Sequence, residues 1–134
     1  MKVLITGVAG FLGSHLAETL SKLGHQIIGV DNMRGGYEDN VPEGITFYKN
    51  DCCDYNKMKD LMKNVDIVYH CAATAHEGLS VFSPFEIGKN NFLASTSIFS
   101  AAIGNNVKRI IFCSSMARYG SQKTPFTEDM KPMP

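Results

Sequence analysis

Three glycines and one aspartate carry the clearest chemistry in this sequence. Gly7, Gly10 and Gly13 follow a short apolar run, and Asp31 stands 18 residues after the last of them, at the end of a second apolar run. Glycines at this spacing let the chain turn tightly, let backbone amides approach a pyrophosphate and let a helix pack closely on a strand. A carboxylate at the position of Asp31 accepts hydrogen bonds from both ribose hydroxyls of an adenosine. The pattern predicts a dinucleotide site.

The glycine pattern alone is a weak signal, because a glycine-rich turn that opens a helix is often only a turn. In the same way, an aspartate at a strand end is often only a solvated turn residue. Here a strand precedes the turn and a helix follows it, which strengthens the prediction. The carboxylate of Asp31 would repel a 2′-phosphate, so we expect NAD rather than NADP. Arg34 would soften that preference if it reached the cofactor, but by itself it reads as an exposed loop residue.

The periodicity of apolar residues predicts the elements that position these groups. Five short runs read as strands: residues 3–5, 25–30, 45–49, 65–71 and 107–113. Three stretches read as helices: residues 11–23, a short stretch after Asp54 that carries Met58, Leu61 and Met62, and residues 84–104. Gly24 suits the end of the first helix and Asp54 the N-cap of the second. Residues 83–86 read as a capping box with proline at the first helical position.

The order of these elements predicts an α/β fold. Nearly all-apolar strands that alternate with helices indicate a parallel sheet covered on both faces, and right-handed crossovers favour the strand order 3-2-1-4-5. We therefore expect a doubly wound, Rossmann-type sheet of about five strands. Residues 1–134 read as one cofactor-binding domain, in which residues 121–134 form a loop without periodicity.

Composition excludes several classes of partner. Thirteen Lys and Arg residues balance thirteen Asp and Glu residues, and no run of like charges offers a surface for nucleic acid. The apolar runs are far shorter than the roughly 20 residues of a membrane span. The first residues lead directly into the glycine turn and do not resemble a signal peptide. We expect no nucleic-acid partner, no membrane partner and a cytoplasmic location.

The cysteines and histidines do not indicate a metal site. Cys52 and Cys53 are adjacent and Cys71 and Cys113 are single, a spacing that matches neither a disulfide framework nor a metal motif, so we expect reduced, buried thiols. The four histidines do not follow the zinc pattern on a helix: His15, His25, His70 and His76.

Longer motifs extend the glycine pattern. They are Thr-Gly-Val-Ala-Gly-Phe-Leu-Gly at 6–13, Asp-Asn at 31–32, Asp-Cys-Cys-Asp at 51–54, His-Cys-Ala-Ala at 70–73 and Ser-Ser-Met-Ala-Arg-Tyr-Gly at 114–120. In these motifs the whole chain resembles the NAD-dependent epimerase/dehydratase family of extended short-chain dehydrogenases/reductases, the group typified by UDP-glucose 4-epimerase. Together with the glycine pattern, the resemblance implies these cofactor-binding residues: Gly7, Gly10, Phe11, Leu12, Gly13, Asp31, Asn32, Arg34, Asp51, Cys52, Cys71, Ala72, Ala73 and Asn90.

The resemblance also assigns two polar positions. The family carries an asparagine that faces the cofactor on the long helix, and Asn90 fits that position better than Asn91. Ser115 matches the hydroxyl that hydrogen-bonds the reacting sugar oxygen, although a serine pair at a strand end is often only a cap. No metal is implied.

Two departures from the family pattern stand out. Ala75 replaces a lysine that reaches a ribose hydroxyl, so we expect that contact to be missing. The family's general acid/base is a Tyr-x-x-x-Lys pair on the helix after the loop seen here at 125–128, and the chain ends before that helix. Tyr119 and Lys123 have the spacing, but Gly120 argues against a helix between them. We expect the sugar-binding domain to be absent as well and the chain alone to be inactive.

Three functions follow, in decreasing order of support. The first is the NAD-binding part of a nucleotide-sugar epimerase/dehydratase, the second is a non-enzymatic NAD-binding sensor or interaction module, and the third is a flavodoxin-like or methyltransferase-like domain. The long helix is apolar on more than one side, and the fifth strand lies at an edge. We therefore expect self-association, most simply as a two-fold dimer. The apolar residues of the helix are Phe85, Phe92, Ile98, Phe99 and Ile103.

Overall fold

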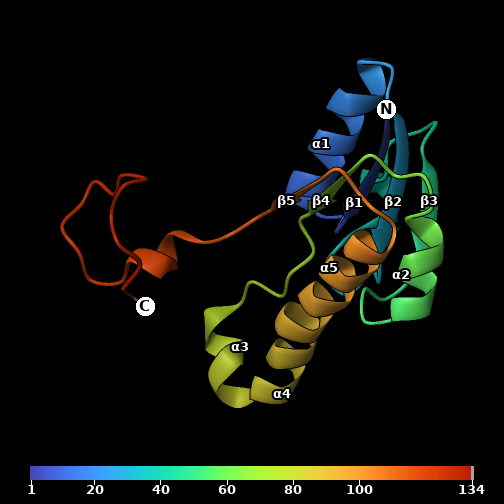
Figure 1. The fold of residues 1–134 in the computed structure, drawn as a ribbon. Helices are drawn as coiled ribbons and strands as arrows, with labels where there is room; N and C mark the ends of the chain where they lie inside the picture. The colour runs from blue at the N-terminus through green and yellow to red at the C-terminus, as the bar shows by residue number, and fades with distance from the viewer. Residues whose placement is uncertain (134) are drawn as a thin grey trace.

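The fold is a five-stranded parallel sheet with helices on both faces (Figure 1). The structure is a computed structural model that describes residues 1–133, the side chain of Glu77 excepted. The strands are β1 Lys2–Thr6, β2 Gln26–Asp31, β3 Thr46–Lys49, β4 Ile67–His70 and β5 Arg109–Phe112. Their order is β3-β2-β1-β4-β5, and every neighbouring pair is parallel. The predicted fold class and strand order are confirmed.

Eight helical segments connect and follow the strands within the described part of the chain. The α-helices are α1 Phe11–Lys22, α2 Tyr55–Leu61, α3 Glu77–Phe82, α4 Pro84–Ile87 and α5 Ala94–Gly104. A π-helical segment, η2 Gly88–Leu93, joins α4 to α5, and two 3₁₀ turns are η1 Glu38–Asn40 and η3 Met116–Tyr119. The sequence did not indicate α3, η1 or η3.

Two apolar cores lie on the two faces of the sheet. One core packs β1, β2 and β4 against α2 and α5 and includes the buried side chains of Leu4, Met58 and Ile98. The other packs β1 and β2 against α1 around Val3 and Ala17. Because both faces of the inner strands are covered, those strands are apolar along most of their length, as expected for a parallel sheet.

Helix α1 packs on the sheet through small residues and two of its leucines. Gly13 and Ala17 are buried, and the partly buried Leu16 and Leu20 pack against the same core, whereas Leu12 on the helix and Leu23 at its C-cap are exposed. The helix ends as predicted at Gly24, which has φ +79°. The amide of Gly24 donates to the carbonyl of Ser21, and the amide of His25 donates to the carbonyl of Leu20. This pair of bonds satisfies carbonyls at the helix end.

The predicted long helix is present but interrupted. Pro84 occupies its first turn, yet the side chain of Ser83 makes no capping hydrogen bond. Glu86, the expected second member of the capping box, pairs instead with Arg34 at 2.6 Å. The π-helical turn η2 then separates α4 from α5. The capping box is therefore wrong, because an ion pair from a distant loop takes its carboxylate.

The chain after β5 leaves the sheet. Figure 1 shows the segment after β5 running away from the body of the molecule and ending in a small loop of its own. Within this segment, the ring of Tyr119 packs against Phe126, and Gln122 donates to the carbonyl of Lys131. None of the helices in residues 1–133 has the length and apolar character needed to span a bilayer.

Candidate functional site

The glycine turn joins the end of β1 to the start of α1. Gly7 has φ +72°, a left-handed conformation that favours glycine, and a Cβ there would lie 2.8 Å from the amide nitrogen of Ala72. A Cβ on Gly13 would overlap the carbonyl oxygen of Gly7. Gly10 differs, because a Cβ there meets only the carbonyl oxygen of Gly7, at 3.3 Å. Two glycines therefore allow close packing within the protein, and the middle one borders open space.

The start of α1 presents backbone amides without a side-chain cap. Gly10 is the N-cap residue and supplies no side chain to hydrogen-bond the first turn. The first N–H groups of an α-helix have no partner within the helix, and they carry the positive end of its dipole. Residues 11–13 supply these groups beside the glycine turn. Such a helix start is suited to bind phosphate.

Asp31 holds the neighbouring loops in place. It is 8% exposed, and one of its carboxylate oxygens accepts the amide of Ala9 at 3.0 Å. The other oxygen accepts the amide of Met33 at 2.8 Å. The carboxylate thus connects the glycine turn to the loop after β2. It also lines a cavity at the ends of the strands, so it borders open space while it fixes the backbone around it.

A cavity of about 1070 Å³ lies at the carboxyl ends of the strands. Its wall includes most of the predicted cofactor-binding residues: Gly7, Gly10, Asp31, Asn32, Arg34, Asp51, Cys52, Cys71, Ala72, Ala73 and Asn90. These residues come from the ends of β1, β2, β3 and β4 and from the helical segment before α5. Ligands of open α/β sheets bind at this edge, where the strand order reverses.

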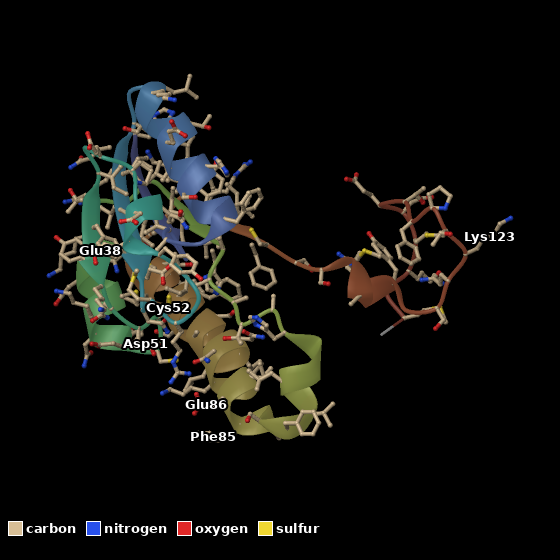
Figure 2. All side chains as sticks on the ribbon, turned by 180° about the vertical axis from the view of Figure 1, so that it is seen from behind. Glu38, Asp51, Cys52, Phe85, Glu86 and Lys123 are labelled. Carbon is tan, nitrogen blue, oxygen red and sulfur yellow. The ribbon has the colours of Figure 1, made fainter. Side chains whose placement is uncertain are left out.

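Charged side chains border one end of this cavity. Arg34, in the loop after β2, forms an ion pair with Glu86 on α4, in which the guanidinium lies 2.6 Å from the carboxylate, and both residues line the cavity. Figure 2 shows Asp51 and Cys52 on the β3 side and Glu86 at the tip of α4. Burial tends to raise the pKa of Asp51, but hydrogen bonds from Cys53 and Asn32 outweigh it and hold that pKa below its usual value. A negative charge at Asp51 is therefore stable beside the cavity.

The π-helical turn η2 directs two asparagines toward the loop after β4. The side chain of Asn91 donates to the carbonyl of Thr74 and accepts the amide of the same residue, at 3.2 and 2.7 Å. Asn90 donates to the hydroxyl of Thr74 at 3.2 Å and lines the cavity. The Oδ1 atom of Asn90 is buried without a hydrogen-bond partner among the described residues. The two asparagines therefore divide their roles, because Asn91 fixes the loop and Asn90 keeps an acceptor free.

A buried histidine connects the cavity wall to α5. His70 Nδ1 lies 2.7 Å from the hydroxyl of Thr6, and His70 Nε2 lies 2.9 Å from that of Ser95. Ser95 donates its only proton to the carbonyl of Asn91, so it must accept from Nε2–H. Thr6 then donates to Nδ1 and accepts the amide of Ala72. Burial lowers the pKa of His70 to about 4, so the ring is neutral.

Comparison with known proteins identifies the family. The sequence profile described as "NAD dependent epimerase/dehydratase family" matches residues 3–134. The chain belongs to this family. A UDP-N-acetyl-alpha-D-glucosaminuronate decarboxylase of Bacillus cytotoxicus is 37% identical over 131 residues, which cover 96% of this chain and 40% of that protein.

Two solved structures of the family have the same fold. UDP-glucose 4-epimerase of Thermotoga maritima, solved with UDP-glucose, has a TM-score of 0.94 and 32% identity, covering 100% of this chain and 45% of that one. The enzyme of Thermus thermophilus, solved in complex with NAD, has a TM-score of 0.92 and 32% identity over the same shares of the two chains. The chain thus spans about two fifths of the length of these epimerase/dehydratase relatives.

Four predicted residues of the epimerase/dehydratase pattern do not line the cavity. Gly13 is buried beneath the turn, and the side chains of Phe11 and Leu12 are 82% and 53% exposed on the outside of α1. All three lie in the first turn of α1, directly after Gly10, which does line the cavity. Ser115 lies beyond β5, where its hydroxyl accepts the amide of Ala117 and caps η3.

The tyrosine and lysine expected of a family acid/base do not meet at the cavity. Tyr119 and Lys123 are not on one helix, because η3 ends at Tyr119 and Gly120 has φ +61°. Figure 2 shows Lys123 in the remote C-terminal loop. Tyr55 and Lys59 also have the spacing, on α2, and our sequence reading overlooked this pair. Neither Tyr55 nor Lys59 lines the cavity, so the pair lies outside the candidate site.

The cysteines match their prediction only in part. All four are free, but only Cys52 is buried as expected, whereas Cys53 and Cys71 are partly exposed and Cys113 is exposed. Among residues 1–133, side chains of the kind that bind metal do not gather in groups of three or more. Three polar contributors were not predicted as site residues: Thr74, Glu86 and Ser95. Their partners Asn91, Arg34 and His70 lie 17 to 52 residues away in the sequence, so no local pattern predicts these contacts.

Proposed function

We propose that this chain is the NAD-binding part of a nucleotide-sugar epimerase/dehydratase. In the whole enzyme, hydride would pass between the nicotinamide of NAD and a hydroxyl-bearing carbon of the sugar. The cavity carries this proposal, because a glycine turn, an uncapped helix start and a buried carboxylate border one volume at the ends of the strands. The relatives solved with UDP-glucose and with NAD support the choice of substrate class and cofactor.

The residues present fit a dinucleotide. The amides of residues 11–13 would bind the pyrophosphate, and Gly10 leaves room for it. Asp31 would accept the hydroxyls of the adenosine ribose. Two backbone amides hold its carboxylate in place at the cavity wall, and each oxygen can accept a second hydrogen bond. Asp51 and Cys52 would border the adenine, and Ala72 and Ala73 the nicotinamide. The unpartnered Oδ1 of Asn90 offers an acceptor to a ligand donor.

The bound NAD would supply hydride acceptance and return, and the protein would supply orientation and proton transfer. Ser115 would hold the reacting sugar hydroxyl by a hydrogen bond, as the family resemblance implies. A positioned acid/base contributes about 10²- to 10⁴-fold in rate. The described residues place no tyrosine–lysine pair at the cavity, so we expect the 134-residue chain alone to bind the cofactor without steady turnover of a UDP-sugar.

Calorimetric titration with NAD and with NADP tests the proposal. We expect saturable, one-to-one binding of NAD and weaker binding of NADP, because Asp31 repels the 2′-phosphate. If the 134-residue chain gives no binding heat with NAD at any concentration, the proposal is overturned. If the chain binds NAD and NADP with equal affinity, the role given to Asp31 is wrong. Incubation with UDP-glucose and NAD, followed by chromatography, tests the expected lack of turnover.

A further inference from the structure

Two free thiols meet at the edge of the sheet. Cys71 directly follows β4 and Cys113 directly follows β5, and their sulfur atoms lie 3.6 Å apart. They come from positions 42 residues apart in the sequence. Both positions directly follow the last paired residues of their strands, and the amide of each still donates to a neighbouring strand. We propose that Cys71 and Cys113 form a reversible disulfide, a modification site that ties β5 to β4 in oxidising conditions.

The backbone already has a geometry that a disulfide accepts. His70 is aligned with Phe112 in the parallel register, so the two cysteines are the next aligned pair. The amide of Cys113 still donates to the carbonyl of His70 at 3.2 Å, which holds the two segments together. Neighbouring strands lie about 4.8 Å apart. That spacing falls within the range of roughly 4.4–6.8 Å between the Cα atoms of bonded cysteines.

The side chains need only a small movement. A disulfide bond is about 2.05 Å long, so the sulfur atoms must approach by less than the width of one atom. The alternation of side chains along the strands places both cysteines on the α1 face, since His70 and Phe112 stack on the opposite face. The two thiols therefore point to the same side of the sheet, and rotation about their side-chain bonds can close the gap.

The other two cysteines do not offer such a pair. Cys52 is buried on the cavity wall, whereas the thiol of Cys53 donates to the carbonyl of Lys89 at 3.4 Å. They are adjacent in sequence, and their side chains have separate surroundings. Burial raises the pKa of the Cys52 thiol and of the Cys71 thiol alike to about 12, so the choice of pair rests on the 3.6 Å between the sulfur atoms of Cys71 and Cys113. Cys53 is therefore a suitable control cysteine.

The two thiols would have different roles in the reaction. Cys113 is exposed, so its thiolate would attack a small disulfide such as oxidised glutathione, and one molecule of reduced glutathione would leave with the proton of Cys113. Cys71 is partly buried against Cys113. Its thiolate would then attack the Cys113 sulfur and release the second glutathione, which takes the proton of Cys71. In balance, two protein thiols lose two electrons and two protons, and one glutathione disulfide becomes two thiols.

The bond would stabilise the edge of the sheet. Strand β5 has a neighbour only on its β4 side, and the closed loop would include α3, α4 and α5. Crosslinks that close long loops reduce the entropy of the unfolded chain. We expect oxidation to raise the melting temperature by at least about 5 °C. Dithiothreitol should reverse the change.

The test is oxidation of the 134-residue chain with oxidised glutathione, followed by thiol counting and peptide mapping without reductant. We expect the four free thiols to fall to two and the new crosslink to join Cys71 to Cys113. The Cys53→Ser variant should form the same crosslink. The Cys71→Ser variant should keep a glutathione bound to Cys113, because no second thiol is at hand to release it.

Four outcomes would overturn the proposal. They are a wild-type chain that keeps all four thiols, one that keeps glutathione on Cys113 without closing the bond, a crosslink that uses Cys52 or Cys53, and a crosslink that forms in the Cys113→Ser variant. All are read from mass and thiol content, without cofactor. The result is therefore independent of whether the chain binds NAD.

Discussion

Asp31 combines a structural contact with a proposed role in cofactor choice. Replacement by alanine removes the acceptor for two backbone amides and for the ribose hydroxyls. We predict that Asp31→Ala weakens NAD binding by about 1–3 kcal/mol, the range for loss of a charged hydrogen-bond partner. Loss of loop order would weaken NAD and NADP alike, whereas loss of repulsion favours NADP. The ratio of the two dissociation constants, measured by calorimetry, should therefore shift toward NADP.

A matched control is Asp60→Ala, which removes an equal charge from the exposed surface of α2. It should leave both dissociation constants unchanged. An Asp31→Ala chain that binds NAD and NADP with the same ratio as the wild type would contradict the assignment of Asp31.

His70 makes stability depend on pH. Its pKa is about 4 in the folded protein, because of burial, and close to 6.5 in the unfolded chain. Between these values the unfolded chain binds the extra proton, so stability rises with pH and is lost as pH falls from about 6.5 toward 4. The difference corresponds to about 3 kcal/mol at most. Urea unfolding of wild type and His70→Gln across this window should show a shallower pH dependence in the variant, and equal slopes would refute the role.

The residues that could be predicted from the sequence are those required by the backbone structure next to them. Gly7, Gly13 and Asp31 are recognisable because a turn, a close helix contact and a strand end each demand a residue type nearby. The network around His70 was not predictable in the same way, because Thr6 lies 64 residues before it and Ser95 lies 25 residues after it. Glu86 was misassigned for the same reason, since its partner Arg34 lies 52 residues away.

At the scale of elements, two glycines at the junction of β1 with α1 have different roles, because Gly13 is needed for packing and Gly10 for the proposed binding of NAD. Gly13→Ala would place a Cβ inside the carbonyl of Gly7, whereas Gly10→Ala would place one 3.3 Å from the same oxygen at a position that lines the cavity. We predict that Gly13→Ala lowers the free energy of unfolding by more than about 2 kcal/mol. Gly10→Ala should fold with a smaller loss and bind NAD more weakly. Denaturant unfolding and calorimetry give the two readouts, and a normal affinity in Gly10→Ala would contradict the proposed path of the pyrophosphate.

The strands were easier to predict than the long helix. Each inner strand is apolar on both faces, so a short β-branched run between turns fixes its place and the rules of crossover fix the order. The helical arm, which we define as residues 77–104 from α3 to α5, has no such constraint. Its interruption at η2 allows Asn90 and Asn91 to reach Thr74, and that contact exists only once β4 and α5 are packed. A π-helical turn of this kind is often found at functional sites and has no sequence pattern.

At the scale of the whole molecule, the helical arm exposes apolar surface. Phe82, Phe85 and Phe92 are between 78% and 85% exposed, and Ile103 is 75% exposed. Ile98 is fully buried, so the arm has an apolar face turned inward and another turned outward. Strand β5 is an edge strand, and the segment after it runs away from the sheet (Figure 1). Apolar surface of this kind is seldom left in water.

We predict that the 134-residue chain self-associates through this arm, most simply as a two-fold dimer. Sedimentation at micromolar concentration should show a species larger than the monomer. The double variant Phe85→Glu/Phe92→Glu should shift it to the monomer, whereas Leu23→Glu, at the exposed C-cap of α1, should not. A wild-type chain that sediments as a monomer and binds no hydrophobic dye would refute the prediction.

The central claim is that the cavity at the carboxyl ends of β1 to β4 holds NAD. A second groove of about 700 Å³ lies between α1 and η1 and shares Gly10 and Gly35 with the cavity; its other lining residues, His15, Glu18 and Glu43 among them, provide an internal comparison. Amide NMR spectra recorded during titration with NAD test the claim most directly. We predict shifts that saturate together at residues 7–13, 31–34, 51–52 and 71–74. Shifts confined to the second groove, or no shifts at all, would contradict the claim.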